Sequence, residues 1–83
     1  MTAPVVVLYG RPGCHLCDEA REILERVRAQ IPFTLLERDI EQDDALHAAY
    51  LERIPVVTVD GVEAFELEVG EAALRDRLVR VHP

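Results

Sequence analysis

Apolar residues follow two different periods along the first half of the chain. Residues 5–9, Val-Val-Val-Leu-Tyr, are apolar throughout, which predicts a strand buried on both faces. From Cys14 the apolar residues recur every three or four positions, so we expect an amphipathic helix that Pro32 stops. A second strand is predicted from about Phe33 to Ile40. The helix positions expected to face inward are Leu16, Ala20, Ile23, Leu24, Val27 and Ile31.

The second half adds a short helix, two strands and a final helix. The short helix is predicted over roughly 43–51, with Asp43 or Asp44 near its N-terminus. Residues 55–59 predict a third strand, and Asp60-Gly61 indicates a two-residue hairpin leading to a fourth strand at about 62–67. The last helix should occupy about 70–81. The inward positions of the two helices are Leu46, Ala49 and Tyr50, and then Ala73, Leu74, Leu78 and Val81.

The predicted elements follow one another in the order β-α-β-α-β-β-α. A strand, a crossover helix and a second strand place the first two strands parallel, whereas the hairpin makes the last two antiparallel. We therefore predict an α/β fold with a four-stranded mixed sheet and helices on both faces. This order is similar to the minimal thioredoxin-like arrangement. Because a chain of 83 residues accommodates one domain, residues 1–83 are expected to form a single domain.

Charge and cysteine spacing narrow the expected function. The formal net charge is −7, from 16 acids against 9 bases that are all Arg, so we expect no nucleic-acid partner. The apolar run 5–8 is far too short to cross a membrane and lacks the preceding charges of a signal peptide. We expect a cytoplasmic monomer without a membrane partner. Because a structural disulfide does not persist in a reducing cytoplasm, two closely spaced cysteines indicate redox chemistry or metal binding.

The segment Cys14-His15-Leu16-Cys17 lies between the first strand and the amphipathic helix. Two intervening residues let the sulfurs meet across one helical turn. Cys14 is expected at the start of the helix, where unpaired N–H groups and the helix dipole favour a thiolate, the nucleophile of disulfide exchange. Cys17 lies further into the helix, from where it can attack a mixed disulfide and release the reduced substrate. We therefore assign Cys14 as nucleophile and Cys17 as resolving thiol.

Other uses of the two cysteines stay open as alternatives. They could be buried structural thiols, a redox-sensitive docking switch for another protein, or the ligands of a carried metal ion or bridged iron–sulfur cluster. A structural zinc ion needs four ligands and the motif supplies two, with His47 and His82 distant in sequence, so no metal site is predicted. Covalent haem is excluded because Asp18, not His, follows the second cysteine.

Arg11 and His15 flank Cys14 and are candidates for tuning it and for binding the substrate. Each can favour the Cys14 thiolate, whereas Asp18 and Glu19 oppose it. The alternatives are a solvated loop charge for Arg11 and a spectator role for His15.

Two longer motifs carry a family resemblance. They are Tyr9-Gly10-Arg11-Pro12-Gly13-Cys14-His15-Leu16-Cys17, and Ile54-Pro55-Val56-Val57 followed by Asp60-Gly61. In both motifs the chain resembles the glutaredoxin branch of the thioredoxin superfamily. The resemblance implies that Pro55 is a cis-proline beside the cysteines and that the backbone of Ile54 is free to pair with an extended substrate. It also implies that Arg11 can approach a glutathione carboxylate.

The chain departs from glutaredoxins at positions that bind glutathione. Glutaredoxins usually carry Pro and Tyr between the cysteines, where this chain has His and Leu. After the hairpin they carry a Gly-Gly pair, and the corresponding residues here are Phe65 and Glu66. A ring and a carboxylate would obstruct close backbone approach, and Glu66 and Glu68 would repel an anionic ligand. We therefore expect weak specific binding of glutathione.

The sequence thus predicts a glutaredoxin-like thiol–disulfide oxidoreductase in cell redox homeostasis. It should act on protein or low-molecular-weight disulfides without an organic cofactor, and a reductase or thiol pool should recycle it. Glutathione or another small thiol could act as co-substrate. The candidate catalytic residues are Cys14 and Cys17, and the candidate substrate-binding residues are Arg11, His15, Ile54 and Pro55.

Overall fold

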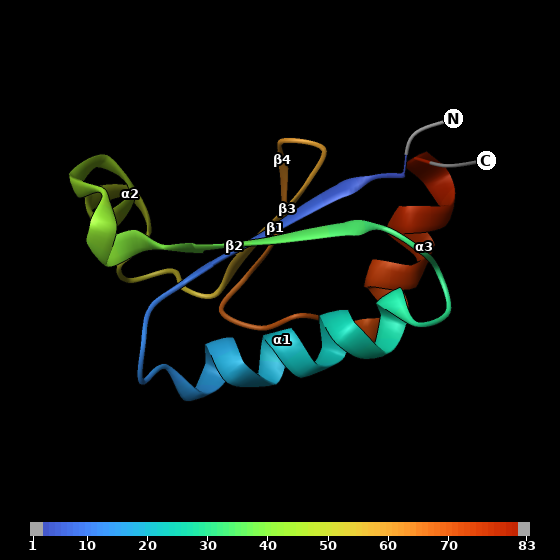
Figure 1. Cartoon of the computed structure of the whole chain (residues 1–83), viewed down its shortest axis with the longest axis horizontal. Helices are drawn as coiled ribbons and strands as arrows, with labels where there is room; N and C mark the ends of the chain where they lie inside the picture. Colours follow the sequence, from blue (N-terminus) through green and yellow to red (C-terminus); the bar gives the residue numbers. More distant parts are fainter. Residues whose placement is uncertain (1–2, 82–83) are drawn as a thin grey trace.

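Four strands form one mixed sheet at the centre of the molecule. The structure is a computed structural model that describes the backbone of residues 3–81 and the side chains of 3–80. β1 (Val5–Gly10) runs parallel to β2 (Thr34–Asp39) and antiparallel to β3 (Val56–Val59), and β3 pairs antiparallel with β4 (Val62–Glu66). The predicted four-stranded mixed sheet is therefore confirmed (Figure 1). In sheet order the strands are β2, β1, β3 and β4.

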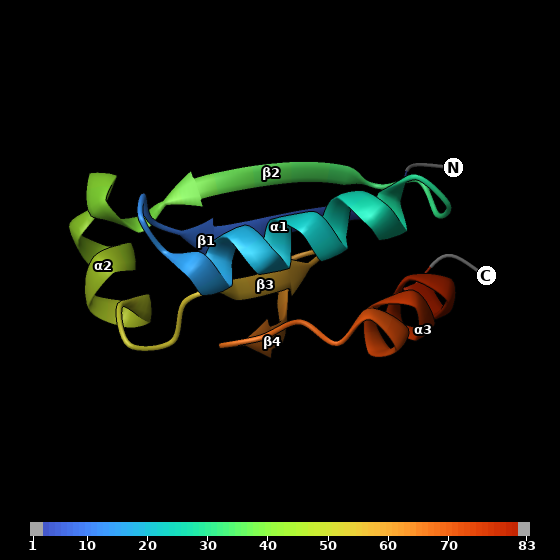
Figure 2. The ribbon, with the colours of Figure 1, turned by 90° about the horizontal axis from the view of Figure 1, so that it is seen from below.

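In the described residues, two α-helices and one 3₁₀ turn connect the strands and a third α-helix follows the last strand, so the order β-α-β-α-β-β-α is as predicted. The view in Figure 2 places α2 at one end of the sheet and α3 at the other. Within residues 3–81, no helix combines the length and apolar character needed to cross a bilayer. The helices are α1 (His15–Arg28), the 3₁₀ helix η1 (Ile40–Gln42), α2 (Asp44–Tyr50) and α3 (Glu71–Val81).

Local signals explain where α1 ends and α2 begins. α1 ends at Arg28, three residues before the predicted Ile31, because the chain closes into a turn there. In this turn the N–H groups of Gln30 and Ile31 both donate to the Val27 carbonyl, at 2.9 and 2.8 Å. α2 begins after Asp43, whose carboxylate accepts hydrogen bonds from two backbone N–H groups of the first turn, as an N-cap does.

The main core lies between the sheet and the two longer helices. Figure 1 shows α1 and α3 on the same side of the strands. The buried side chains of each helix pack against alternate side chains of β1 and β3. Core-facing residues therefore recur with a period of two in the strands and of 3.6 in the helices. The buried members are Val6, Leu8, Ala20, Leu24, Val27, Phe33, Val57, Val59, Val69, Leu74 and Leu78.

Three predicted inward positions are wrong. Leu16 is 47% exposed, because its side chain lines a surface groove with the β4–α3 connection rather than the core. Ala73 and Ala49 are also exposed. On α3 the buried stripe is narrow and consists of Leu74 and Leu78. The side chain of Val81 lies outside the described residues.

The opposite face of the sheet is covered by a helix at one end only. There the ring of Tyr50 on α2 packs against that of Tyr9, with centroids 4.9 Å apart. Further from α2, Val5 is 37% exposed, although Val6 and Leu8 on the other face are buried. The prediction that β1 is buried on both faces is therefore wrong, because the seven-residue α2 is too short to cover it. Helices do lie on both faces, as predicted.

The β3–β4 hairpin has the turn that its sequence predicts. Asp60 and Gly61 have φ angles of 49° and 83°, and Val59 pairs with Val62 directly beside them. Both central residues of a two-residue type I′ turn need positive φ, which Asp tolerates and Gly adopts freely. The hairpin brings the end of β4 back to the segment that precedes β3.

Candidate functional site

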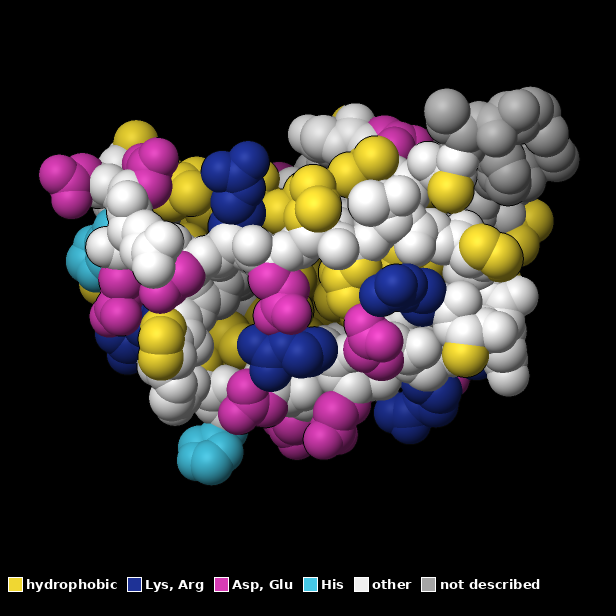
Figure 3. Space-filling view, in the orientation of Figure 1, with side chains coloured by type: hydrophobic (Ala, Val, Ile, Leu, Met, Phe, Trp, Pro, Cys, Tyr) yellow, Lys and Arg dark blue, Asp and Glu magenta, His cyan; other side chains and the backbone are white. Residues whose placement is uncertain are grey.

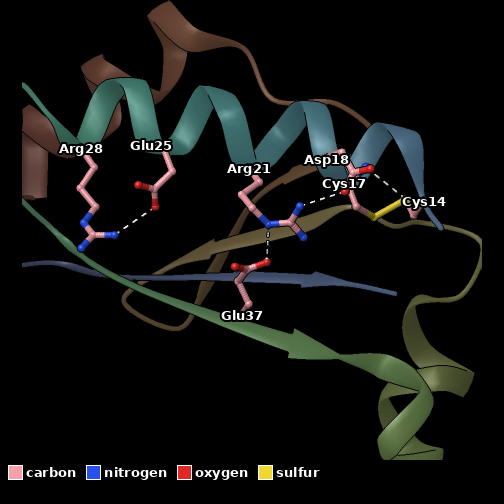
Figure 4. A network of polar contacts seen from close by, with 7 residues as sticks. All are labelled: Cys14, Cys17, Asp18, Arg21, Glu25, Arg28 and Glu37. Carbon is pink, nitrogen blue, oxygen red and sulfur yellow. Dashed lines mark hydrogen bonds and ion pairs between the residues drawn. A yellow bond between two sulfur atoms is a disulfide. The ribbon is translucent and has the colours of Figure 1, made fainter. Parts of the chain in front are cut away.

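Cys14 and Cys17 form a disulfide at the N-terminal end of α1, with Cα atoms 5.2 Å apart (Figure 4). Cys14 is the N-cap residue of the helix, with extended backbone angles (φ −90°, ψ 107°). Its Sγ accepts a hydrogen bond from the Cys17 N–H at 3.1 Å. When the disulfide is open, this donor and the positive end of the helix dipole stabilise negative charge on the Cys14 sulfur.

The two cysteines differ in their access to solvent. Cys17 is 1% exposed, whereas Cys14 is partly exposed. A disulfide approaching from solvent therefore meets the sulfur of Cys14 first. The assignment of Cys14 as nucleophile and Cys17 as resolving thiol stays a prediction. It requires that Cys14 be more exposed than Cys17, as is the case here.

Cys17 packs directly against the backbone of Gly10, the last residue of β1. A Cβ at Gly10 would lie 2.9 Å from the Cys17 Sγ and 3.2 Å from the Cys17 Cβ, so the sulfur could not keep its place. In the sequence, Gly10 belongs to the motif shared with glutaredoxins, but no contact was predicted for it. Nothing local in the sequence indicates this contact, because it joins the end of β1 to the first turn of α1 through the fold.

A small apolar cluster surrounds the disulfide and includes Ile54. The Ile54–Pro55 peptide bond is cis, and both residues are buried. In the described loops and turns, the N–H and C=O of Ile54 form no backbone hydrogen bond. The carbonyls on either side of it, those of Arg53 and Pro55, both accept from the N–H of Leu67. The cluster consists of Cys17, Ile40 and Ile54, with the partly buried Tyr9, Cys14, Leu46 and Tyr50 packed against them.

The other two predicted site residues stay exposed beside this cluster. The Arg11 guanidinium lies 3.8 Å from the Glu41 carboxylate, and each side chain is nearly half exposed. Such a pair contributes about 0–1 kcal/mol. Arg11 and Cys17 also line a surface cavity of about 390 Å³ between α1 and β2. His15 is the first residue of α1 and is exposed.

An ion-pair network borders the disulfide on the β2 side. Arg21 donates to Glu37 at 2.7 Å and to Asp18 at 2.9 Å, and so ties α1 to β2 (Figure 4). These hydrogen bonds, the one with Glu37 foremost, raise the pKa of the Arg21 guanidinium. Acidic and basic side chains alternate on this face of the molecule (Figure 3). Within residues 3–81, no group of three or more His, Cys, Asp or Glu side chains could hold a metal ion.

The residues at the Gly-Gly positions of glutaredoxins have partners inside this protein. Phe65 packs against the main core. Glu66 accepts a hydrogen bond from Arg53 at 2.9 Å, and Arg53 also pairs with Glu63. The Arg53 guanidinium lies over the ring of Tyr50, 5.3 Å from its centroid. Hydrogen bonds with Glu66 and then Glu63 raise the pKa of Arg53.

Sequence reasoning missed Arg53, although the chain contains a signal for it. An antiparallel hairpin brings the segment that precedes β3 beside the end of β4, and opposite charges occupy both places. The charge of Glu66 is therefore balanced from within the protein, and Phe65 faces the core. The expectation that these two residues weaken glutathione binding stays a prediction.

Comparison with solved structures defines the class of protein. The chain is 26% identical to protein Ne2328 from Nitrosomonas europaea, with a TM-score of 0.82 and 94% of each chain covered. It is 32% identical to protein XcR50 from X. campestris, with a TM-score of 0.75, covering 94% of this chain and 99% of that one. A mutant thioredoxin from Halobacterium salinarum NRC-1, at 23% identity and a TM-score of 0.70, shows the shared fold, covering 95% of this chain and 74% of its own. The fold is thioredoxin-like, and the paired cysteines support a redox thiol function.

The chain belongs to the glutaredoxin-like domain family (DUF836), whose model matches residues 5–79. The resemblance to glutaredoxins is therefore confirmed. The chain is also 32% identical over 85 residues to the uncharacterised proteins Rv0508 of Mycobacterium tuberculosis and Mb0520 of Mycobacterium bovis. These alignments cover 96% of this chain and 88% of each relative.

Proposed function

We propose that this protein is a thiol–disulfide oxidoreductase that reduces protein or low-molecular-weight disulfides in cell redox homeostasis. One observation carries the proposal. Cys14 is partly exposed, caps α1 through its Sγ, and is bonded to a cysteine that is 1% exposed. This arrangement provides one sulfur for exchange with an outside partner and a second, protected sulfur for the internal step.

The reaction starts from the reduced protein. The Cys14 thiolate attacks one sulfur of the substrate disulfide, forming a mixed disulfide and releasing the first substrate thiolate. The Cys17 thiolate then attacks the Cys14 Sγ, which releases the second substrate thiolate and forms the Cys14–Cys17 disulfide. Two electrons pass from the dithiol to the substrate, and the released thiolates take up protons from solvent.

Substrate binding is assigned to the backbone and side chains around Cys14. Ile54, which has no backbone hydrogen bond in the described loops, offers its N–H and C=O to an extended segment, with Pro55 beside it. Arg11 can contact a carboxylate of the substrate, and His15 can modulate the reduction potential through its charge. In a reducing cytoplasm a reductase or thiol pool returns the disulfide to the dithiol.

The donor is expected to be a thioredoxin-reductase-type enzyme or a small thiol other than glutathione. An exposed Arg11–carboxylate contact contributes at most about 1 kcal/mol. Glu66, which occupies one of the Gly-Gly positions and is exposed, obstructs the close backbone approach that a tripeptide thiol would need. The net charge of −7 further disfavours an anionic ligand.

Insulin reduction coupled to NADPH oxidation tests the proposal directly. Thioredoxin reductase, and glutathione with glutathione reductase, serve as alternative donors, and Cys14→Ser is the control. We expect turnover with the first donor to exceed turnover with the second. If the chemically reduced protein transfers no electrons to insulin beyond the Cys14→Ser level, the protein is not an oxidoreductase of this kind. A single turnover without recycling by any donor would instead indicate a redox-sensitive binding module.

A further inference from the structure

Leu67 follows β4 in a backbone conformation that leucine rarely adopts. Its φ of 69° lies in the left-handed region, where a side chain with a Cβ is disfavoured. Its N–H donates to the carbonyls of Arg53 and Pro55, at 3.1 and 2.9 Å, and so holds the residue against the segment that contains Ile54. The side chain is nevertheless 48% exposed. Packing within the chain therefore does not account for a leucine at this position.

Leu67 and Leu16 line the same surface groove beside the disulfide. Leu16 lies between the two cysteines and is 47% exposed. The groove has a volume of about 170 Å³, and its other apolar residues are Ala20, Ile23 and Val69. It extends from the first turn of α1 to the β4–α3 connection. An extended segment paired with Ile54 could place a neighbouring side chain there.

Two carboxylates, those of Glu19 and Glu68, line the same groove. Neither takes part in a salt bridge in the described part of the chain. Asp18 and Glu66, their near neighbours in sequence, are both paired with arginines. The groove thus combines an apolar lining with negative charge that nothing described in the protein compensates.

We propose that this groove is a specificity subsite for an extended basic polypeptide. The apolar side chain next to the substrate cysteine packs between Leu16 and Leu67, and a neighbouring Lys or Arg lies at the carboxylates of Glu19 and Glu68. The inference rests on the proposed function, because Cys14 must attack the cysteine that this segment carries. Apolar burial supplies affinity, and complementary charge supplies orientation and association rate. A second copy of the chain is disfavoured as the occupant, since each copy carries a net charge of −7.

Three synthetic pentapeptides with blocked ends test the proposal. Their sequences are Lys-Leu-Cys-Leu-Lys, Lys-Ser-Cys-Ser-Lys and Glu-Leu-Cys-Leu-Glu, each with its cysteine in a mixed disulfide with thionitrobenzoate. Attack by the Cys14 thiolate on the peptide sulfur releases the thionitrobenzoate anion, whose absorbance gives the second-order rate constant. We expect the first peptide to react about tenfold faster than the second, as an apolar pocket discriminates. It should react about three- to tenfold faster than the third, with a difference that shrinks as salt is added.

Matched variants identify the residues responsible. Leu67→Ser should bring the ratio between the first two peptides close to one, whereas Val62→Ser, at the other end of β4 and 57% exposed in the parent, should leave it unchanged. Glu19→Gln with Glu68→Gln should abolish the preference for lysine over glutamate. The control for charge is Glu25→Gln with Asp76→Asn, which removes two carboxylates outside the groove.

The outcomes separate this proposal from the function on which it rests. If no peptide releases thionitrobenzoate faster with the parent protein than with Cys14→Ser, the proposed function fails and the subsite proposal with it. Equal rates for all three peptides leave the oxidoreductase standing and overturn the subsite. Equal effects of Leu67→Ser and Val62→Ser also overturn it. If sedimentation shows a dimer that Leu67→Ser dissociates, the groove is an interface between copies and the proposal is wrong.

Discussion

Gly10→Ala should damage the redox site through a single methyl group. The new Cβ would lie 2.9 Å from the Cys17 Sγ. Normal contact needs about 3.5 Å or more, so the atoms must separate by roughly 0.6 Å. The φ of Gly10 is not among the positive values of this chain, so the substitution adds no backbone strain. Relieving an overpacked contact of this kind costs about 1–3 kcal/mol.

The oxidised form should bear most of this cost. Its Cys17 sulfur is bonded to Cys14 and cannot rotate, whereas a free thiol can turn to another rotamer. The variant should therefore be easier to reduce. If the reduced form escapes the whole cost, the reduction potential rises by about 20–60 mV, since about 30 mV corresponds to 1.4 kcal/mol for two electrons.

Urea unfolding of both redox forms, together with equilibration in a dithiothreitol redox buffer, measures the two effects separately. Gly70→Ala is the matched control, because its new Cβ would meet the Ala73 Cβ at an ordinary 3.6 Å. We expect the potential of the control to equal that of the parent. An oxidised Gly10→Ala protein as stable as the parent would refute the packing argument. Equal destabilisation of both forms, with no change in potential, would refute the redox argument alone.

The remaining predictions concern catalysis, donor choice and the core. Cys17→Ser should accumulate a mixed disulfide with the substrate, visible by mass spectrometry of the intact protein, whereas Cys14→Ser should form none; equal trapping by both would contradict the division of roles. Glutathione with glutathione reductase should support only slow reduction of a glutathione mixed disulfide, and Glu66→Gly should accelerate it more than Glu66→Gln while leaving the core contact of Phe65 intact; parent turnover equal to that of an ordinary glutaredoxin would contradict this. Leu24→Ala should lower the free energy of unfolding by about 2–5 kcal/mol in urea titrations, because the side chain is 0% exposed, and a loss below 1 kcal/mol would contradict the core assignment.

The strand order and the helix order could be predicted because local patterns carry them. The Asp60-Gly61 turn and the strand-forming residues 55–59 are local signals of a few residues, and the hairpin has the predicted geometry. The predictions of burial that were wrong concern side chains whose exposure depends on segments distant in sequence. Val5 belongs to an apolar run typical of a strand buried on both faces, yet no local pattern tells how far α2 reaches across the sheet. Leu16 has the helical spacing of a core residue, but its side chain lies in a surface groove beside the β4–α3 connection.

Of the candidate site, the sequence predicted the pair of cysteines but not the contacts around it. The spacing of Cys14 and Cys17 is a local signal, and the structure joins them as a disulfide. The contact of Gly10 with the buried sulfur and the pairing of Arg53 with Glu66 join elements that the fold brings together. Such contacts follow from the register between strands and from the path of the loops, which a single sequence specifies only through the completed packing.

The central position of β1 has a consequence for how the chain is made. β1 is synthesised before both of its neighbours in the sheet, and β3 follows only at Val56. At about 5–20 residues per second, some 2–10 s of translation separate the end of β1 from β3. During that time the valines of the nascent strand have an unpaired edge, which is a template for association with other chains. β2 is closer to β1 along the chain than β3 is, so the parallel β1–β2 pair can form first. The β3–β4 hairpin then pairs with the other edge of β1.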